Sequence, residues 1–173
     1  MGHDPRDEIW KSCFDTFYES YFEEMVADHL LHRWSLLDDI NKWLIAITAS
    51  GSAVSGWALW NNPDMKMVWV GLASVSALLA ITHSALGVQQ RIKNWEGSKK
   101  TFVKLRVELG WLRQDISIDP NFDIDITRNR LDLLRKSYGD EMSRLSPDTL
   151  RTRKLEQRIQ DRLNDTISDQ LEV

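Results

Sequence analysis

The amino-acid sequence predicts an all-α protein: a two-span transmembrane helical hairpin with a long amphipathic N-terminal helix and C-terminal cytoplasmic helices. Two apolar segments, Trp43 to Trp60 and Met67 to Val88, contain no Asp, Glu, Lys or Arg. Outside them, apolar residues recur at steps of three and four, which is the spacing of an amphipathic helix. Short breaks that contain proline separate the periodic segments at 61–64, 119–121 and 146–148. These observations favour helices throughout the chain.

Residues 1–42 are predicted to form an N-terminal cytoplasmic amphipathic helix. Its apolar face is interpreted as a packing surface for the C-terminal helices or for a second copy. That face consists of Trp10, Phe14, Phe17, Tyr21, Met25, Leu36, Leu37 and Ile40. His29 and His32 lie near Glu24 and Asp28 on the same helix. A zinc site requires three or four convergent ligands, so this pair of histidines does not predict a metal site.

Residues 43–88 are predicted to cross the membrane twice, with spans at about 43–60 and 67–88. At about 1.5 Å of rise per residue, segments of this length just cross a hydrocarbon core about 30 Å thick. Tryptophans fall near the segment ends, where amphipathic rings favour the membrane interface. A hairpin buried in the core of a soluble helical oligomer is the alternative, because periodicity alone does not separate the two arrangements.

Small and hydroxyl-bearing residues share faces within the two spans. Such faces allow helices to approach closely and to form hydrogen bonds, or they line a wet path if several hairpins assemble. The helix-packing or pore-lining candidates are Thr48, Ser52, Ser55, Gly56, Ser76, Ala80, His83 and Gly87. His83 is the ionisable side chain in the spans, which makes it a functional candidate. An interhelix hydrogen bond is favoured over an ion path for this histidine.

Residues 89–173 are predicted to form a cytoplasmic region with helices at about 89–118, 124–145 and 147–171. The first of these carries a heptad seam that can seat against another helix. Its members are Trp95, Ser98, Phe102, Leu105, Leu109, Leu112 and Ile116. The last helix is predicted to begin with Ser146 as its cap. Its apolar residues recur at strict four-residue steps, so this stripe should wrap obliquely over its neighbours.

A basic cluster follows the second apolar segment. It consists of Arg91, Lys93, Lys99, Lys100, Lys104 and Arg106. Because positive charge stays on the cytoplasmic side, the cluster predicts that both termini of the membrane hairpin lie in the cytoplasm. The cluster also predicts contact with anionic lipid headgroups at the membrane surface. The alternative is that these basic side chains lie on a helix face that only contacts solvent.

Several classes of function are not indicated by the sequence. There is no phosphate-binding loop, nucleotide fingerprint, nucleophile elbow or metalloprotease pair, so neither an enzyme nor a cofactor is predicted. The net charge of −4 and the absence of a strongly basic region give no reason to expect direct nucleic-acid binding. The single cysteine, Cys13, permits no internal disulfide.

The layout resembles the SLATT family of bacterial two-span effector domains. The resemblance lies in the aromatic-rich first helix, the hairpin with its Asn-Asn-Pro-Asp turn, and the charged helix that begins QQRIKNWEGSKKTFVKLRVELGWL. It implies an anti-phage or conflict-system effector that oligomerises and permeabilises the inner membrane. It also implies an activating partner, which would be a nucleotide-signalling enzyme, a reverse transcriptase or a sensor protein.

Two hypotheses of function follow. The first is a membrane-perturbing homo-oligomeric effector that causes abortive infection when it is triggered. The second is a non-toxic two-span membrane scaffold that recruits a cytoplasmic partner through its helical arms. The sequence leaves open the activating signal, the number of copies, the ion selectivity, the resting and active conformations, and any role of His83 beyond packing.

Overall fold

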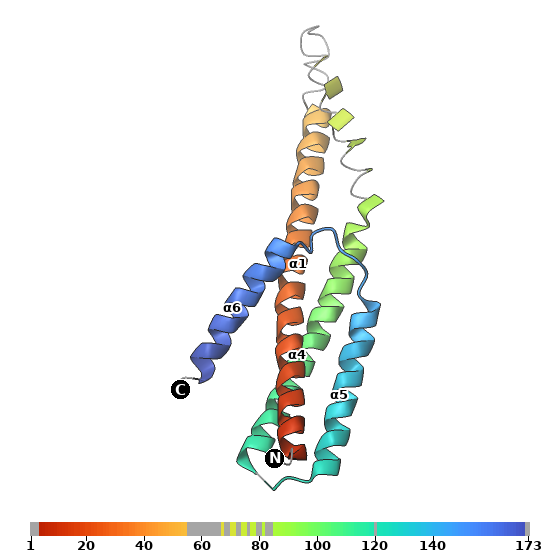
Figure 1. The fold of residues 1–173 in the computed structure, drawn as a ribbon. Coiled ribbons are helices and arrows are strands. Elements are labelled where there is room, and N and C mark those ends of the chain that lie inside the picture. The colour runs from red at the N-terminus through yellow and green to blue at the C-terminus, as the bar shows by residue number, and fades with distance from the viewer. Residues whose placement is uncertain are drawn as a thin grey trace. The chain divides into compact units, whose positions relative to one another are not determined.

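The computed structural model shows an all-helical chain. It describes residues 4–54, 67, 70, 71, 74, 75, 77, 78, 81, 85–119 and 121–171. Within them the elements are α1 (Pro5–Val54), α4 (Val88–Ile118), α5 (Ile124–Arg144) and α6 (Arg153–Leu171) (Figure 1). The all-α part of the predicted fold class is therefore confirmed.

The predicted transmembrane hairpin is wrong. Across the described residues, no helix combines the length and the apolar composition that a membrane crossing requires. In α1, Asp38, Asp39 and Lys42 keep the apolar run from starting before Trp43, so the described part of this run covers Trp43 to Val54. About twelve residues rise only about 18 Å, which is well short of a hydrocarbon core about 30 Å thick.

Parts of the predicted hairpin lie outside the described residues. This holds for the end of the first segment from residue 55, for the turn at 61–64, and for ten of the 22 residues of the second segment, 67–88. The predicted inner-membrane localisation, with both termini cytoplasmic, depends on the two spans. It is contradicted by the same finding that no described helix can cross a membrane.

The start of α6 also differs from the predicted one. The sequence places Ser146 at the cap, but the helix begins at Arg153. Thr152 takes the cap position, because its side-chain oxygen accepts a hydrogen bond from the Leu155 backbone N–H at 3.3 Å. Upstream, the Asp148 carboxylate accepts a hydrogen bond from the Leu150 backbone N–H at 2.8 Å, which holds this stretch as a turn.

The chain forms two compact units. Unit 1 comprises Met1–Leu30 and Trp95–Val173, and unit 2 comprises Leu31–Asn94. Unit 1 therefore contains the first half of α1, most of α4, and all of α5 and α6. Unit 2 contains the second half of α1 and the beginning of α4.

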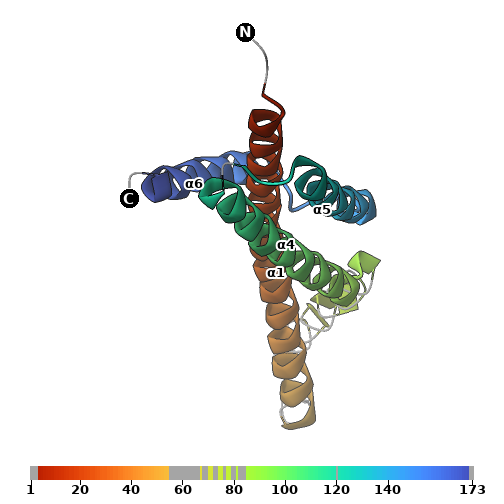
Figure 2. The ribbon, with the colours of Figure 1, turned by 90° about the horizontal axis from the view of Figure 1, so that it is seen from below.

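Unit 1 is a helical bundle with one apolar core. Its α4 runs antiparallel to α1, since Cys13 lies beside Leu109 while Glu24 lies beside Arg106. Helix α5 returns antiparallel to α4, and α6 crosses α1 obliquely (Figure 2). The core comprises Ile9, Cys13, Phe17, Val26, Ala27, Leu30, Trp95, Phe102, Leu105, Leu109, Leu112, Ile116, Leu131, Leu134, Leu155, Ile159, Leu163 and Ile167.

Unit 2 has a smaller described core around Trp34 and Val88, both of which are buried. The Arg91 guanidinium lies 5.2 Å from the centre of the Trp34 ring, which is a cation–π distance. On the next turn of α1, Asp38 accepts a hydrogen bond from Gln89 at 2.8 Å and pairs with Lys42 at 2.6 Å. These contacts hold the beginning of α4 against α1 within this unit.

Candidate interaction surfaces and a buried polar network

The side chains of seven of the eight predicted helix-packing or pore-lining residues lie outside what the structure describes. Thr48 and Ser52 lie on α1, in a part of the helix whose side chains are not described. The candidates that fall outside the described residues are Ser55, Gly56, Ser76, Ala80 and His83.

Gly87 serves a backbone role that the sequence pattern does not reveal. Its φ of 59° lies in the left-handed region, which side chains with a Cβ rarely adopt. Its carbonyl accepts a hydrogen bond from the Arg91 backbone N–H at 3.0 Å. The residue therefore forms the turn that leads into α4.

The predicted membrane-surface basic cluster is largely engaged in ion pairs within unit 1. Lys99 pairs with Asp28 at 2.6 Å, and Arg106 pairs with Glu24 at 2.5 Å. On α4 itself, Lys100 pairs with Glu96 and Lys104 with Glu108. In unit 2, Arg91 lies over Trp34, and Lys93 is exposed. Sequence reasoning missed the first two pairs because their members are 71 and 82 positions apart.

The predicted partner-binding seam on α4 is buried inside unit 1. All seven of its residues are almost fully covered: Trp95, Ser98, Phe102, Leu105, Leu109, Leu112 and Ile116. They pack against the other helices of the same chain. Exposed surfaces elsewhere are therefore the candidates for contact with another protein.

Among the described residues of unit 1, the most buried charged side chain is that of Glu23. It accepts two hydrogen bonds from the Arg151 guanidinium, at 2.7 and 2.9 Å. The same guanidinium donates a third bond to Glu156 at 2.8 Å. Burial lowers the pKa of Arg151, but the hydrogen bonds to the two carboxylates outweigh it and raise the pKa above its ordinary value. This bidentate pair joins the α5–α6 connection to α1.

Tyr138 lies beside this ion pair. Its ring packs against Phe102, with the ring centres 6.1 Å apart. Burial raises the pKa of the Tyr138 hydroxyl, and the nearby carboxylates of Glu19 and Glu23 raise it further. The Tyr138 hydroxyl therefore stays protonated at neutral pH.

Two further buried hydrogen bonds connect α4 to the end of α5 and the loop that follows it. The Trp95 indole N–H donates to Asp148 at 2.7 Å, and the Ser98 hydroxyl donates to Glu141 at 2.6 Å. Buried polar side chains are costly unless they are paired, so these bonds fix how the helices align. The network is structural, since each of these acids is held by a partner within unit 1.

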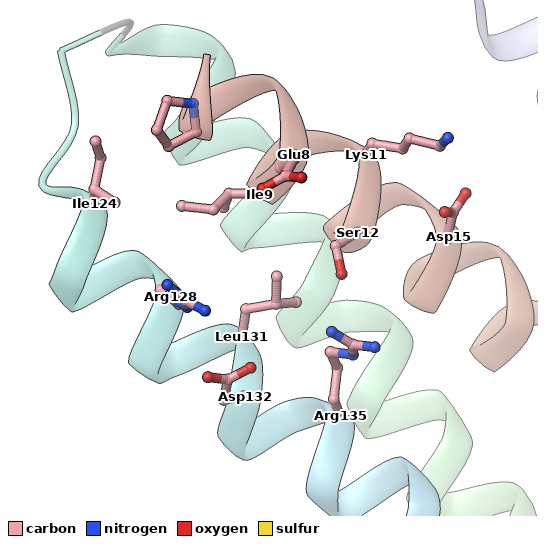
Figure 3. A pocket seen from close by; sticks show the side chains of 11 residues that line it. Glu8, Ile9, Lys11, Ser12, Asp15, Ile124, Arg128, Leu131, Asp132 and Arg135 are labelled. Carbon is pink, nitrogen blue, oxygen red and sulfur yellow. The ribbon is translucent and has the colours of Figure 1, made fainter. Parts of the chain in front are cut away.

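A groove separates the N-terminal part of α1 from α5 (Figure 3). It holds about 420 Å³. In Figure 3, Arg135 points from α5 toward Ser12 of α1, and Leu131 lies between Arg128 and Arg135. A second cavity of about 380 Å³ adjoins this groove and shares Ser12, Asp15 and Arg135 with it.

The groove walls carry charges of both signs. Helix α1 contributes Glu8, Lys11 and Asp15, while α5 contributes Arg128, Asp132 and Arg135. The formal charges cancel, so the groove does not select an anion or a cation. A further cavity of about 350 Å³ between α1, α4 and α6 is similarly mixed in charge.

The described residues contain no group of three or more His, Cys, Asp or Glu side chains arranged to hold a metal ion. His29 lies in unit 1 with its Nδ1 atom 3.3 Å from the Met25 carbonyl oxygen. His32 is exposed in unit 2. Cys13 is fully buried, and burial raises the pKa of its thiol to about 11, against the opposing charge of Arg113.

An apolar row lies exposed on α1 within unit 2. We call it the α1 row; it consists of Leu36, Leu37, Ile40, Trp43 and Leu44. These side chains are between 37% and 70% exposed. Their spacing places all five on one side of the helix. Large exposed apolar side chains gathered in this way are typical of a surface that contacts a protein, a membrane or a ligand.

Fold and surfaces together define an all-helical chain with a structural polar network and an exposed apolar helix face. Comparison with known proteins found no match among protein-family models, curated proteins or solved structures.

Proposed function

We propose that the chain is a helical subunit that acts by assembling with copies of itself, and that the α1 row is the contact. The observation that carries this proposal is the exposure of five large apolar side chains on one helix face. Within the row, Leu37, Ile40 and Leu44 follow the alternating three- and four-residue steps of a coiled-coil seam. Leu36 and Trp43 widen the seam on one side.

A second copy fits the α1 row better than a partner selected by charge. A two-fold contact requires a surface that is complementary to itself. An uncharged apolar row meets this condition, because apolar side chains of one copy are covered by apolar side chains of the other. Each covered leucine or isoleucine contributes about 1.5–3 kcal/mol of burial free energy, part of which offsets the entropy lost on association.

The expected result of the double substitution Leu37→Asp and Ile40→Asp is loss of self-association. Two carboxylates would have to be desolvated in the seam, so the contact should weaken by at least about a hundredfold. Light scattering coupled to size-exclusion chromatography measures the mass of the assembly. Ile45→Asp is the matched control, because Ile45 is 44% exposed on α1 but lies outside the row. Unchanged mass in the double variant would rule out the α1 row as the contact.

The second candidate function is that of a conflict-system effector. Such an effector must self-associate, and the α1 row provides a surface for self-association. Induced expression should then arrest growth, and the Leu37→Asp, Ile40→Asp variant should restore it. A helical scaffold predicts harmless expression instead, together with an assembly that depends on the same row. The two roles are separated by counting viable cells after the parent chain and the Leu37→Asp, Ile40→Asp variant are induced to equal protein levels.

A further inference from the structure

Two large apolar side chains are exposed on α4 of unit 1, and two more are exposed on α5. On α4 they are Trp111 and Ile118, which are 58% and 72% exposed. On α5 they are Ile126 and Leu133, which are 68% and 69% exposed. The members of each pair stand seven positions apart, about two turns of an α-helix, so each pair lies on one side of its helix. Each helix therefore carries a short apolar stripe outside the core.

An ion pair joins the middles of the two stripes. Asp115 of α4 and Arg130 of α5 each follow the first apolar residue of their stripe by four positions and precede the second by three, so they share its side of the helix. The Arg130 guanidinium lies 3.4 Å from the Asp115 carboxylate. The two stripes therefore adjoin and form one surface. We call it the α4–α5 face; it consists of Trp111, Asp115, Ile118, Ile126, Arg130 and Leu133.

The α4–α5 face is separate from the groove between α1 and α5. That groove is lined by other residues of α5, namely Ile124, Arg128, Leu131, Asp132 and Arg135. The face instead lies on the side of α5 that meets α4 at the Asp115–Arg130 pair and continues outward to solvent. It is therefore open to a second molecule.

The residues of the face lie at matched levels on the two helices. Because α5 runs antiparallel to α4, Trp111 lies at about the level of Leu133 on the neighbouring helix. Ile118 lies at about the level of Ile126. The ion pair separates these two apolar levels, so the face reads as apolar, charged and apolar along the helices.

This arrangement is complementary to itself about one two-fold axis. When two copies meet face to face about an axis parallel to the helices, the α4 stripe of each copy covers the α5 stripe of the other. Each apolar side chain then meets an apolar one, and Asp115 meets Arg130 of the second copy. The two carboxylates and two guanidiniums form a ring in which the signs alternate. An axis across the helices would place like charges against each other, so the charges select the first arrangement.

Opposite charges continue the two stripes at one end of the face. Lys104 precedes Trp111 by seven positions on α4, and Asp140 follows Leu133 by seven positions on α5. Both side chains are exposed. About the same two-fold axis, Lys104 meets Asp140 of the second copy, so the charge complementarity extends beyond the central ring.

We propose that the α4–α5 face binds the same face of a second copy about a two-fold axis parallel to the two helices. The charge complementarity of the face carries this proposal, and four large apolar side chains per copy supply the buried surface. The contact goes beyond the proposed function, because the α1 row lies in unit 2 and the α4–α5 face lies in unit 1. It does not depend on the α1 row.

Charge reversal tests the pairing between the copies. Asp115→Arg alone and Arg130→Asp alone each place like charges against each other, so each variant should bind itself about tenfold or more weakly than the parent does. An equal mixture of the two variants should form a hetero-pair, because every charge then meets its opposite on the other chain. Within each chain of that hetero-pair the like charges stay side by side, so recovery on mixing reports the contact between chains.

The parent and all variants in this test carry Leu37→Asp and Ile40→Asp, so the α1 row does not contribute to the measured association. Sedimentation equilibrium over a series of high protein concentrations gives the dissociation constants, and it detects pairs that dilution on a chromatography column would separate. A fluorescent label on one variant identifies the hetero-pair. Asp161→Arg is the matched control, because Asp161 is exposed on α6 outside the face. Circular dichroism verifies that every variant folds.

Trp111→Ala tests the apolar part of the contact. The dissociation constant should rise about tenfold or more, because the indole is the largest side chain of the face. Trp10→Ala is the matched control, since Trp10 is 43% exposed on α1 and lies outside the face. In chains too dilute to pair, Trp111→Ala should leave the free energy of unfolding nearly unchanged, because the indole is exposed in the single chain.

A parent that stays monomeric at every concentration in this background would overturn the α4–α5 contact. The same holds for equal dissociation constants in the parent and the charge variants, or for no hetero-pair on mixing. The proposed function fails by a different measurement. Its readout is the mass of the Leu37→Asp, Ile40→Asp variant compared with that of the chain with an intact α1 row, and both chains have the same α4–α5 face.

Discussion

Replacing Glu23 by alanine is expected to lower the free energy of unfolding by about 2–4 kcal/mol, because Arg151 then loses a bidentate partner inside unit 1. The Glu23 side chain is 5% exposed and that of Arg151 is 24% exposed. Removal of one member of such a pair leaves a charge that is no longer compensated. The cost is below that of a fully buried pair, since Arg151 keeps Glu156 and some access to water. Urea unfolding followed by circular dichroism measures the difference.

Two further variants separate the pair from the rest of the network. Glu23→Leu combined with Arg151→Met removes both charges, and much of the lost stability should return. Glu96→Ala breaks the exposed Glu96–Lys100 pair on α4 and should cost much less stability than Glu23→Ala. A loss in Glu23→Ala as small as that in Glu96→Ala would show that the buried pair does not stabilise the bundle.

Replacing Phe102 by alanine is expected to cost about 3–5 kcal/mol of stability. Phe102 is 0% exposed and packs against Tyr138 at the centre of unit 1. The substitution loses the transfer free energy of the ring and leaves a cavity that the surrounding helices fill only in part. Chemical unfolding of the variant and the parent chain at equal concentration gives the difference directly.

Trp111→Ala on the same helix is the control for this substitution. Trp111 is a larger aromatic residue, but it is 58% exposed. Its removal should change stability by less than about 1 kcal/mol, because little buried surface is lost. Similar losses at the two positions would contradict the assignment of Phe102 to the core of the bundle.

The helices could be predicted from the sequence because their apolar spacing is local information. Helix α5 begins at the predicted Ile124 and ends at Arg144, one residue before the predicted end. The four-residue stripe of α6 is buried from Leu155 through Ile167, in agreement with the predicted oblique packing. Periodicity shows which side of a helix is apolar, and in α4 and α6 that side faces the core. On α1 it does not: of the predicted apolar face only Phe17 is buried, while Trp10, Leu36, Leu37 and Ile40 are exposed.

What covers an apolar side could not be predicted, because that depends on residues far apart in the chain. The α4 seam was predicted to pack either against the helix that follows it or against a partner, and it is covered by helices of its own unit. The basic cluster was assigned to lipid, yet Lys99 and Arg106 pair with acids of α1. The ion pair between Arg151 and Glu23 joins positions 128 residues apart. Regular spacing contains no signal for such a contact.

The transmembrane prediction failed for a related reason. The absence of charge over a stretch of sequence was interpreted as a span, whereas no described helix is long and apolar enough to cross a membrane. The exposed residues of the α1 row lie just before and at the start of the first apolar segment, and we propose a protein contact for them instead. None of the predicted small residues in the hairpin contributes a described side-chain contact to the sites discussed above.

The burial of Cys13 gives this chain an internal measure of how often its bundle opens. The thiol lies between α1 and α4, with its sulfur 3.7 Å from the Leu109 carbonyl oxygen. At neutral pH its thiolate fraction is minute, because the pKa is raised to about 11. Alkylation must therefore wait for a separation of these two helices. Its rate relative to that of an unfolded chain reports the free energy of that separation without any added probe.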